Sequence, residues 1–346
     1  MVVDDASEGR PARIKDVAAR AGVSLKTVTN VVHERPYVRA DTRQRVLDAI
    51  DELDYRPSMV GRQLQSGRSN ILTLAVPRID EPYLGSLAHA LIAAATPRGY
   101  TLLIDETGGD HDREREASEG YPGHGIDGVI FSAIALDPAH LAAVSNRSPL
   151  VLLGERVPGS SADYVAIDNE QSGREAVQHL LGLGRRRIAF LGDQPGRPST
   201  VGAVRRRAYD HQLDEAGVRL LPERVVAADR FSREEGSELA AALWQRDPTI
   251  DAIVCASDLL AIGAMRRLRQ LGVRVPDDVA VTGWDDAVDG RYSSPSLTTV
   301  ATDLAVLAGR TLDALARRID GDRSEGATFV VPHQLVVRES SASPTH

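Results

Sequence analysis

The chain has 346 residues, which is too long for one compact core, so two or three domains are expected. Its hydrophobic fraction of 42% and its charged fraction of 26% are typical of a globular protein. No apolar run reaches the ~18 residues of a membrane span, and the polar N-terminal residues do not resemble a secretory signal. The single cysteine, Cys255, excludes an internal disulfide, and we therefore expect a cytoplasmic protein.

The net charge of −8 is unevenly distributed along the chain. Residues 10–45 contain nine basic and three acidic side chains, which gives this segment a local net charge of +6. A basic segment on an acidic protein can bind phosphates while the acidic remainder is repelled by DNA. The charge pattern therefore permits DNA binding through the N-terminal segment.

Residues 13–33 predict a helix-turn-helix. Four apolar residues spaced i, i+3, i+4, i+7 form one face of a first helix: Ile14, Val17, Ala18 and Ala21. Gly22 can adopt the left-handed conformation that ends this helix, and Ser24 can cap the next one by accepting a backbone N–H. The second helix would turn its valine-rich face towards the first and place its early residues in a DNA major groove. An ordinary helical hairpin is the alternative interpretation.

A third helix is expected from Asp41 to Leu53, with Val46, Ile50 and Leu53 on its core face. Tyr55-Arg56-Pro57 should end it, because the residue before a proline avoids helical geometry. Residues 58–65 can form two further helical turns, and residues 65–69 predict a linker.

From Ile71 onwards, short apolar runs alternate with helical patterns, which is typical of βαβ units and parallel sheets. The nine expected strands are Ile71–Val76, Thr101–Asp105, Gly128–Ser132, Leu150–Leu153, Val165–Asp168, Ile188–Gly192, Val225–Ala228, Ala252–Ala256 and Val279–Gly283. This number suits two doubly wound lobes better than one sheet. Ligands of such sheets bind at the carboxyl ends of the strands, so acidic residues there are candidates to bind a polar ligand. These residues are Asp105, Glu155, Asp168, Asp193, Asp258 and Asp285.

Features that would point to an enzyme or a cofactor are not supported. Residues 123–128 satisfy G-x-G-x-x-G, but they precede a predicted strand instead of following one, so the dinucleotide-binding context is wrong. The nine histidines show no metal-ligand spacing, and no Ser/His/Asp set has a recognisable context. We therefore expect no cofactor, no metal and no catalytic residue.

A series of motifs follows in one order from Arg13 to Ser341. They are Asp16-Val17-Ala18, Ala21-Gly22-Val23-Ser24, Thr27-Val28, Thr42-Arg43, Tyr55-Arg56-Pro57, Gly125-Ile126-Asp127-Gly128-Val129-Ile130, His179-Leu180-Leu181-Gly182-Leu183-Gly184, Ser257-Asp258-Leu259-Leu260-Ala261-Ile262-Gly263-Ala264, Val281-Thr282-Gly283-Trp284-Asp285-Asp286, Pro295-Ser296-Leu297-Thr298-Thr299-Val300 and Val336-Val337-Arg338-Glu339-Ser340. Together they resemble the lactose-repressor (LacI) family of transcription regulators. The resemblance implies a small all-α helix-turn-helix head and an α/β periplasmic-binding-protein-like core of two doubly wound lobes.

The resemblance also implies the division of the chain. Residues 1–57 would form the helix-turn-helix DNA-binding domain, residues 58–69 a hinge helix and linker, and residues 70–346 the effector-binding and dimerisation core. Within this core, the N-lobe would comprise about residues 70–168 and 298–328, and the C-lobe about residues 169–297 and 329–341.

Several DNA contacts are implied position by position. The family's base-reading positions are occupied by Leu25, Lys26 and Asn30. Lysine can donate to guanine, and asparagine can pair with adenine. Phosphate contacts, which set register without reading sequence, are implied for Thr27, Arg35, Tyr37 and Thr42. Arg39 stands where relatives often have a capping serine, so the third helix should begin without a good cap.

The hinge segment contributes two further candidates, Met59 and Leu64. Leu64 matches a leucine that in relatives wedges open the central base step from the minor groove. Apolar wedges of this kind unstack and kink DNA. The plain alternative is that Leu64 packs a short helix.

The effector-contact positions of the family fall on eight residues. They are Asp80, Tyr83, Arg156, Arg205, Phe231, Ser257, Asp258 and Asp285. Carboxylates and guanidinium groups bind hydroxyls in pairs, and aromatic rings can stack on the C–H face of a sugar. Plain alternatives exist: Arg205 begins a run of three arginines that could be a solvated face, and Asp258 could cap the helix that follows it.

The resemblance therefore predicts a homodimeric repressor of carbohydrate-metabolism genes. It would bind a pseudopalindromic operator in double-stranded DNA and respond allosterically to a small sugar-like effector. A dimer is expected because the leucine-heptad tail of tetrameric relatives is absent. The alternatives are a sugar-binding α/β enzyme, such as a kinase or dehydrogenase, and a ligand sensor that does not read DNA.

Overall fold

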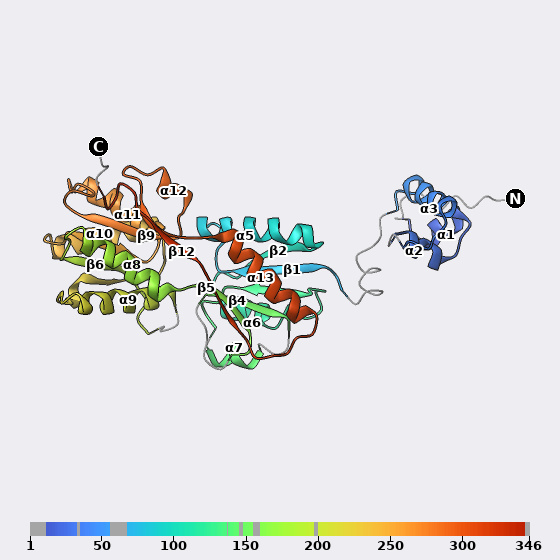
Figure 1. The fold of residues 1–346 in the computed structure, drawn as a ribbon, viewed down its shortest axis with the longest axis horizontal. Helices are drawn as coiled ribbons and strands as arrows, with labels where there is room; N and C mark the ends of the chain where they lie inside the picture. Colours follow the sequence, from blue (N-terminus) through green and yellow to red (C-terminus); the bar gives the residue numbers. More distant parts are fainter. Residues whose placement is uncertain are drawn as a thin grey trace. The chain divides into compact units, whose positions relative to one another are not determined.

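The computed structural model describes residues 12–32, 35–55, 68–136, 138–144, 148–154, 160–196 and 200–342. The chain forms two compact units, residues 1–69 and residues 70–346 (Figure 1). Among the described residues, no helix combines the length and apolar character needed to cross a membrane.

The first unit contains three short helices around a small core. They are α1 (Ile14–Ala21), α2 (Leu25–Val32) and α3 (Ala40–Glu52). The buried core consists of Val17, Ala18, Ala21, Val28, Val31, Val46 and Ala49. Residues at the predicted helical spacings, Ile14, Val32, Ile50 and Leu53, pack against it and are partly buried. The predicted faces of all three helices are thus confirmed.

The turn between α1 and α2 has the predicted chemistry. Gly22 has a φ of 64°, and the Val23 N–H closes the end of α1 by donating to the Ala18 carbonyl at 3.0 Å. Ser24 caps α2, because its Oγ accepts from the Thr27 N–H at 3.1 Å. Arg39 precedes α3 without a side-chain capping bond, as expected.

The N-lobe of the second unit is built on a six-stranded sheet, in which every paired strand is parallel. Its strands, in spatial order, are β11 (Thr328–Val331), β5 (Asp163–Ile167), β4 (Leu150–Leu153), β3 (Gly128–Phe131), β1 (Ile71–Val76) and β2 (Thr101–Glu106). Its helices are α5 (Pro82–Ala95), the 3-10 turn Thr96–Arg98, α6 (His111–Ser118), α7 (Pro138–Val144) and α13 (Leu304–Ile319). The buried side chains form two clusters: one includes residues of α5 and α13, and the other includes residues of α6 and α7.

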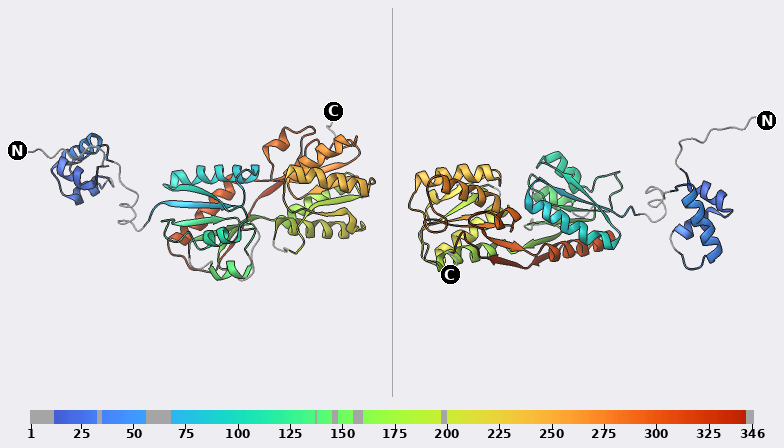
Figure 2. Two further views of the ribbon diagram at one scale, coloured as in Figure 1. Left: turned by 180° about the vertical axis from the view of Figure 1, so that it is seen from behind. Right: turned by 90° about the horizontal axis from the view of Figure 1, so that it is seen from above.

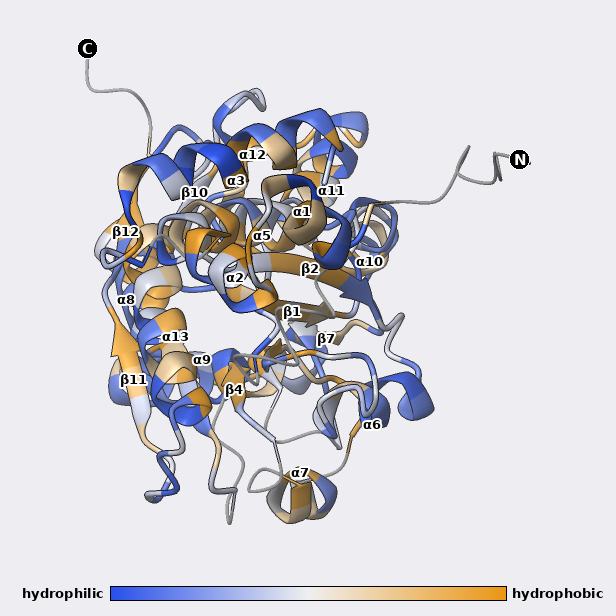
Figure 3. Cartoon of the chain, turned by 90° about the vertical axis from the view of Figure 1, so that its right-hand side faces the viewer, coloured by the Kyte–Doolittle hydropathy of each residue, from blue (hydrophilic) through white to orange (hydrophobic). Residues whose placement is uncertain are grey.

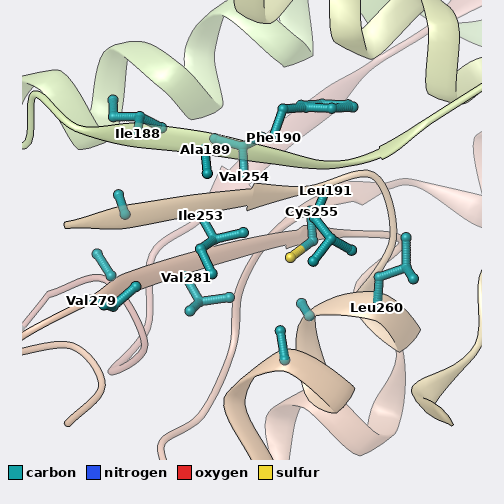
Figure 4. Close-up of a cluster of buried hydrophobic side chains, with 14 of the residues drawn as sticks. Ile188, Ala189, Phe190, Leu191, Ile253, Val254, Cys255, Leu260, Val279 and Val281 are labelled. Atoms are coloured by element: carbon teal, nitrogen blue, oxygen red, sulfur yellow. The ribbon is translucent and has the colours of Figure 1, made fainter. Parts of the chain in front are cut away.

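The C-lobe of the second unit also contains a six-stranded sheet. Its strands, in spatial order, are β12 (His333–Val336), β10 (Thr298–Thr302), β9 (Ala280–Trp284), β8 (Ala252–Cys255), β6 (Ile188–Asp193) and β7 (Val225–Ala227). Only the β10–β12 pair is antiparallel. Its helices are α8 (Asn169–Gly182), α9 (Val201–Glu215), the 3-10 turn Pro222–Arg224, α10 (Arg233–Arg246), α11 (Asp258–Gln270) and α12 (Val288–Arg291). Figure 4 shows β6, β8 and β9 contributing apolar side chains to its core.

The chain passes between the two lobes three times, from β5 to α8, from β10 to α13, and from β11 to β12 (Figure 2). At the first crossing, Ile167 packs against the apolar cores of both lobes. Two short peptide segments and the link between β11 and β12 therefore join the two sheets.

The expected lobe boundaries are wrong at two places. Residues 298–302, assigned above to the N-lobe, form β10 and pair with β9 of the C-lobe. Residues 329–331, assigned to the C-lobe, belong to β11 and pair with β5 of the N-lobe. The reason is pairing, since a strand belongs to the sheet that satisfies its backbone hydrogen bonds. The nine expected strands are present, whereas β10, β11 and β12 were missed.

Helices α10 and α11 approach closely through two glycines. A Cβ at Gly263 would clash with the backbone carbonyl of Arg233, and a Cβ at Gly236 would clash with the backbone of Leu260. Backbone atoms cannot move aside as a flexible side chain can. The pair sets the position of the N-terminal ends of both helices.

We expect Gly263→Ala to lower the free energy of unfolding of the second unit by about 1–3 kcal/mol, because the added methyl group overpacks this crossing. Gly309→Ala is the matched control. Gly309 lies within α13, and a Cβ added there would meet no other atom, so alanine should raise the free energy of unfolding by about 0.5–1 kcal/mol. Urea unfolding monitored by tryptophan fluorescence measures both, since Trp244 and Trp284 lie in this unit. Equal effects of the two substitutions would contradict the close-packing interpretation.

Candidate functional sites

Helix α2 has one buried face and one exposed face. Val28 and Val31 are buried, whereas Leu25 is 52% exposed and Lys26 is exposed beside it. An apolar side chain held in solvent at the start of a helix has no packing role within this unit. The exposed face has the composition and position of a recognition helix that enters a major groove.

The other predicted DNA contacts surround this face. Asn30 is half-buried, and its Oδ1 accepts from the Tyr37 hydroxyl at 3.3 Å. Tyr37 is 70% exposed. The Thr27 Oγ1 lies 2.9 Å from the Ser24 Oγ, so this predicted phosphate contact also takes part in the helix cap. Half-buried Thr42 donates its N–H to the Asp41 carboxylate at 2.7 Å.

Arg35 is exposed in the loop between α2 and α3. Its carbonyl accepts from the Arg43 Nη2 at 2.6 Å, which fixes this loop against α3. This supporting role of Arg43 was missed, because a side-chain bond to a backbone carbonyl eight residues earlier has no sequence signal. Met59, Leu64 and the hinge segment around them lie outside the described residues.

In the N-lobe, the predicted effector residues lie at the start of α5. Asp80 is exposed and accepts two hydrogen bonds from Arg78, at 2.9 and 2.6 Å. The hydrogen bond from Arg78 lowers the pKa of the Asp80 carboxyl. Tyr83 is half-buried in the first turn of α5. Arg156 lies outside the described residues.

In the C-lobe, Arg205 is a buried cation on α9, with 6% of its surface exposed. Its Nε donates to the Asn169 Oδ1 at 2.9 Å, and its Nη1 donates to the Ala256 carbonyl at 2.6 Å. Its guanidinium carbon lies 4.6 Å from the centre of the Trp284 ring. This arginine is therefore not part of a solvated charged face, which was the alternative interpretation.

Asp285 follows β9 with a φ of 103°, a backbone conformation that is strained for any residue except glycine. Its N–H donates to the Val300 carbonyl at 2.9 Å, which holds the turn against β10. Burial raises the pKa of the Asp285 carboxyl, and the positive charge of Arg205 acts in the opposite direction.

The electrostatics bring residues of both lobes together. Burial raises the pKa of the Tyr83 hydroxyl, the Asp285 carboxylate raises it further, and the Arg205 guanidinium opposes this increase. Tyr83 belongs to the N-lobe, while Arg205 and Asp285 belong to the C-lobe. We name these three residues the inter-lobe site. A hydroxyl, a cation and a carboxyl group within electrostatic reach of one another are the chemistry that a polyhydroxylated ligand needs.

Ser257 and Asp258 have structural partners. The Ser257 Oγ caps α11 by accepting from the Leu260 N–H at 3.3 Å. The buried Asp258 carboxylate accepts from the Thr299 Oγ1 and from the Ala287 N–H, each at 2.7 Å. The cap of α11 is thus Ser257, not Asp258 as the alternative interpretation supposed. Burial, followed by the charge on Asp285, raises the pKa of the Asp258 carboxyl well above its usual value.

Phe231 precedes α10 and is only partly buried against the C-lobe core. Several acidic residues at strand ends instead have local roles. Asp105 accepts from Arg113 and from Tyr121, both at 2.7 Å. Asp168 caps α8 through the Gln171 N–H at 2.8 Å. Glu155 lies outside the described residues.

Glu81 was not predicted as a site residue. Burial and the charge on Asp285 raise the pKa of its carboxyl to about 7. Glu81 directly precedes α5 and makes no side-chain cap bond there. A proline at the first helical position is a local signal of a helix start, but the interaction of Glu81 with Asp285 depends on how the lobes meet.

A surface depression of about 680 Å³ lies elsewhere on the C-lobe. Its lining residues are Arg187, Trp244, Pro248, Thr249, Ile250 and Asp278. Arg187 directly precedes β6, and Ile250 and Asp278 lie two residues before the starts of β8 and β9. The depression therefore lies at the amino ends of these strands, opposite the edge that carries Asp285. No group of three or more potential metal ligands is present among the described residues.

Comparisons with known proteins match both units. Residues 13–58 match the bacterial regulatory proteins of the lacI family, and residues 177–341 match a periplasmic binding protein-like domain. The HTH-type transcriptional regulator MalR of Streptomyces coelicolor is 34% identical over 342 residues, which cover 96% of this chain and 97% of MalR.

Two solved structures are similar over nearly the whole chain. The complex of the transcriptional regulator CelR with cellobiose is 30% identical, covers 95% of this chain and 100% of its own, and has a TM-score of 0.71. The Lac repressor dimer bound to operator and the anti-inducer ONPF is 26% identical to this chain. The match covers 96% of this chain and 100% of the Lac repressor chain, with a TM-score of 0.85. The protein is thus a DNA-binding transcriptional regulator with a periplasmic-binding-protein-like core, and not an enzyme. It belongs to the LacI family of bacterial regulatory proteins.

The raised pKa of Glu81 predicts a pH-dependent stability. The folded chain keeps this proton up to about pH 7, whereas an unfolded glutamate loses it near its ordinary value of 4.5. The stabilisation by this group is therefore complete below about pH 4.5 and is lost as the pH rises to about 7. Glu81→Gln removes the charge, so its Tm should exceed that of the wild type by more at pH 8 than at pH 5.

Differential scanning calorimetry at the two pH values measures this difference. Asp80→Asn is the control: the Asp80 pKa is lowered, so its Tm difference from the wild type should be the same at pH 5 and pH 8. A Glu81→Gln effect that does not change with pH would show that the carboxyl is not protonated in the folded chain.

Proposed function

We propose that this protein represses carbohydrate-metabolism genes in the cytoplasm, as a dimer that binds a pseudopalindromic operator and releases it when a small sugar binds between the lobes. The observation that carries the proposal is that one chain combines an exposed α2 face with an inter-lobe site of opposite charges. A DNA reader has no need for Arg205 and Asp285, and a sugar-binding enzyme has no need for the exposed Leu25 and Lys26.

The first part of the proposal concerns DNA binding and gives each predicted contact residue a role. Leu25, Lys26 and Asn30 would read base edges from α2, where each good contact discriminates by about 1–3 kcal/mol. The exposed or half-buried Thr27, Arg35, Tyr37 and Thr42 surround this face and would hold phosphates. Met59 and Leu64 would reach the minor groove between the two half-sites.

The effector half rests on hydroxyl chemistry. Arg205 and Asp285 can bind neighbouring hydroxyls as donor and acceptor, while Tyr83 and Phe231 can contact the C–H face of a sugar ring. In the inter-lobe site the one cation, Arg205, is accompanied by the acidic side chain of Asp285, so a neutral sugar fits better than a phosphorylated one. The CelR–cellobiose complex, a relative with the same fold, supports this ligand class.

A dimer is supported by the open edge of the N-lobe sheet. Strand β2 is the last strand of the sheet, and its Leu103 and Ile104 are 46% and 42% exposed. Figure 3 shows hydrophobic colouring along β1 and β2. An exposed apolar edge strand is normally covered, and the related Lac repressor is described as a dimer bound to operator.

The sugar would act through its differential affinity for two arrangements of the lobes, typically worth 1–3 kcal/mol of coupling. Closure around the ligand would change how the two N-terminal units of a dimer are presented to DNA. Release by sugar, rather than co-repression, is the direction that we propose.

The proposed DNA contacts predict two different kinds of loss. Lys26→Ala should relax base preference at one position of each half-site, because it removes a base contact worth about 1–3 kcal/mol. Arg35→Ala should weaken binding to specific and non-specific DNA alike, and should reduce the slope of log K against log salt by about 1. Fluorescence anisotropy with operator variants at several salt concentrations measures both.

Arg115→Ala is a matched control, since Arg115 is an exposed arginine on α6, outside the DNA-binding unit. It should change neither base preference nor the salt slope. If Lys26→Ala weakens binding to all DNA sequences equally, Lys26 contacts a phosphate and does not read a base.

The function as a whole is tested by selecting random duplex DNA with the full-length protein at a stated salt concentration near physiological. The selection is run without ligand and with glucose, maltose, cellobiose or ribose. We expect an enriched pseudopalindrome whose enrichment one of these sugars abolishes. Sugar binding with no enriched DNA would instead support the ligand sensor, and enrichment that only a sugar permits would show co-repression.

A further inference from the structure

The guanidinium of Arg205 is fixed on three sides. Two contacts lie at its edge, the Asn169 Oδ1 at 2.9 Å from Nε and the Ala256 carbonyl at 2.6 Å from Nη1. The third is with Trp284, because the guanidinium carbon lies over the Trp284 ring, 4.6 Å from its centre. Two hydrogen bonds and a ring contact together restrict the position of a planar cation.

These contacts come from three different elements. Ala256 lies between β8 and α11, and Trp284 is the last residue of β9, directly before Asp285. Asn169 is the first residue of α8, only two residues after Ile167 ends β5 in the N-lobe. One partner of Arg205 thus lies at the first crossing between the lobes.

The side chain of Asn169 is not used to cap its own helix. Asp168 already caps α8 by accepting from the Gln171 N–H at 2.8 Å. Asn169 is 4% exposed, so its carbonyl oxygen is a buried acceptor directed at a buried cation. Removing such an acceptor leaves a charged donor without its partner in a place that water enters poorly.

Trp284 makes its polar contact through the ring face. It is 1% exposed, and its Nε1 has no hydrogen-bond partner among the described residues. A buried indole normally satisfies its N–H, so the cation above the ring is the polar interaction that the structure gives it.

We propose that Asn169 and Trp284 are positioning residues that hold Arg205 for the effector, and that Asn169 links this arginine to the first crossing between the lobes. The inference rests on the proposed function, because it takes Arg205 as an effector contact. A ligand that binds Arg205 then acts on the N-terminal end of α8, where the chain enters the C-lobe. Sugar affinity and its effect on DNA binding depend on the same hydrogen bond.

The test compares Asn169→Ala, which removes the acceptor, with Asn169→Asp, which keeps an oxygen at the same position. Gln171→Ala is the matched control, because it removes an exposed amide from the same turn of α8. All are made in full-length protein carrying Trp244→Phe, so that Trp284 is the one remaining tryptophan of the two in the chain.

Two readouts are taken. The first is the emission and acrylamide quenching of Trp284 without ligand, which reports whether the guanidinium still covers the ring. The second is the affinity for glucose, maltose, cellobiose and ribose, with operator binding measured with and without the sugar that binds. Asn169→Ala should change the Trp284 signal and weaken sugar binding about tenfold to a hundredfold, while operator affinity without sugar stays within about twofold.

Asn169→Asp should restore the Trp284 signal and most of the sugar affinity, and Gln171→Ala should change neither. Unchanged emission and unchanged sugar affinity in Asn169→Ala would overturn the proposal, as would equal losses in the alanine and aspartate variants. If none of the four sugars binds the wild type, the proposed effector class fails. The Trp284 signal then decides by itself whether Asn169 positions Arg205.

Discussion

The arrangement of the inter-lobe site depends on one buried carboxylate. Asp258, at the start of α11, accepts hydrogen bonds from the Thr299 hydroxyl of β10 and from the Ala287 N–H that follows β9. It also lies so close to Gly283 that a side chain there would clash with its Oδ1. These contacts join α11, β9 and β10 at one point. A buried carboxylate is tolerated only when such donors satisfy it.

The turn after β9, next to the Asp258 contacts, contains a strained backbone and several charged side chains. The φ of 103° at Asp285 costs roughly 1–3 kcal/mol and persists only because its neighbours hold it. Asp286, the next residue, accepts from Arg338 at 2.6 Å and from Arg291 at 2.5 Å. The turn is thus held on both sides, and the Asp285 carboxylate is left beside Arg205 and Tyr83. A strained turn held in this way can present a ligand group with little freedom to reorient.

Much of the fold was predictable because it depends on local chemistry. The αL glycine at position 22, the Ser24 cap and the apolar spacing of α1 need only neighbouring residues, and all three are confirmed. The nine predicted strands are apolar runs that a buried parallel sheet requires. Strand β10 lacks this signature, because its sequence is rich in threonine and its two buried threonines are satisfied by Asp258 and by residues near the C-terminus.

The site residues can also be divided into those that the sequence indicated and those that only the fold revealed. The residue types at Tyr83, Arg205 and Asp285 indicated ligand chemistry, and the structure brings them together. Glu114 shows the opposite case: it lies in a highly charged helix, yet it is fully buried and accepts three backbone N–H bonds from residues 134–136. Nothing in the local sequence distinguishes Glu114 from its charged neighbours in this helix, so its burial could not be predicted from the sequence.

Helix starts, turns and strand positions follow from the order of residues, because their energies arise between groups a few positions apart. Other features arise only when the chain folds. They are the pairing of β10 with the C-lobe sheet, the partners of Asp258, the surroundings of Glu81 and the hydrogen bond between Asn169 and Arg205. Each joins groups that lie between 16 and 204 positions apart in the chain. Such contacts are decided by the pairing of sheets and the packing of helices, which no local pattern encodes.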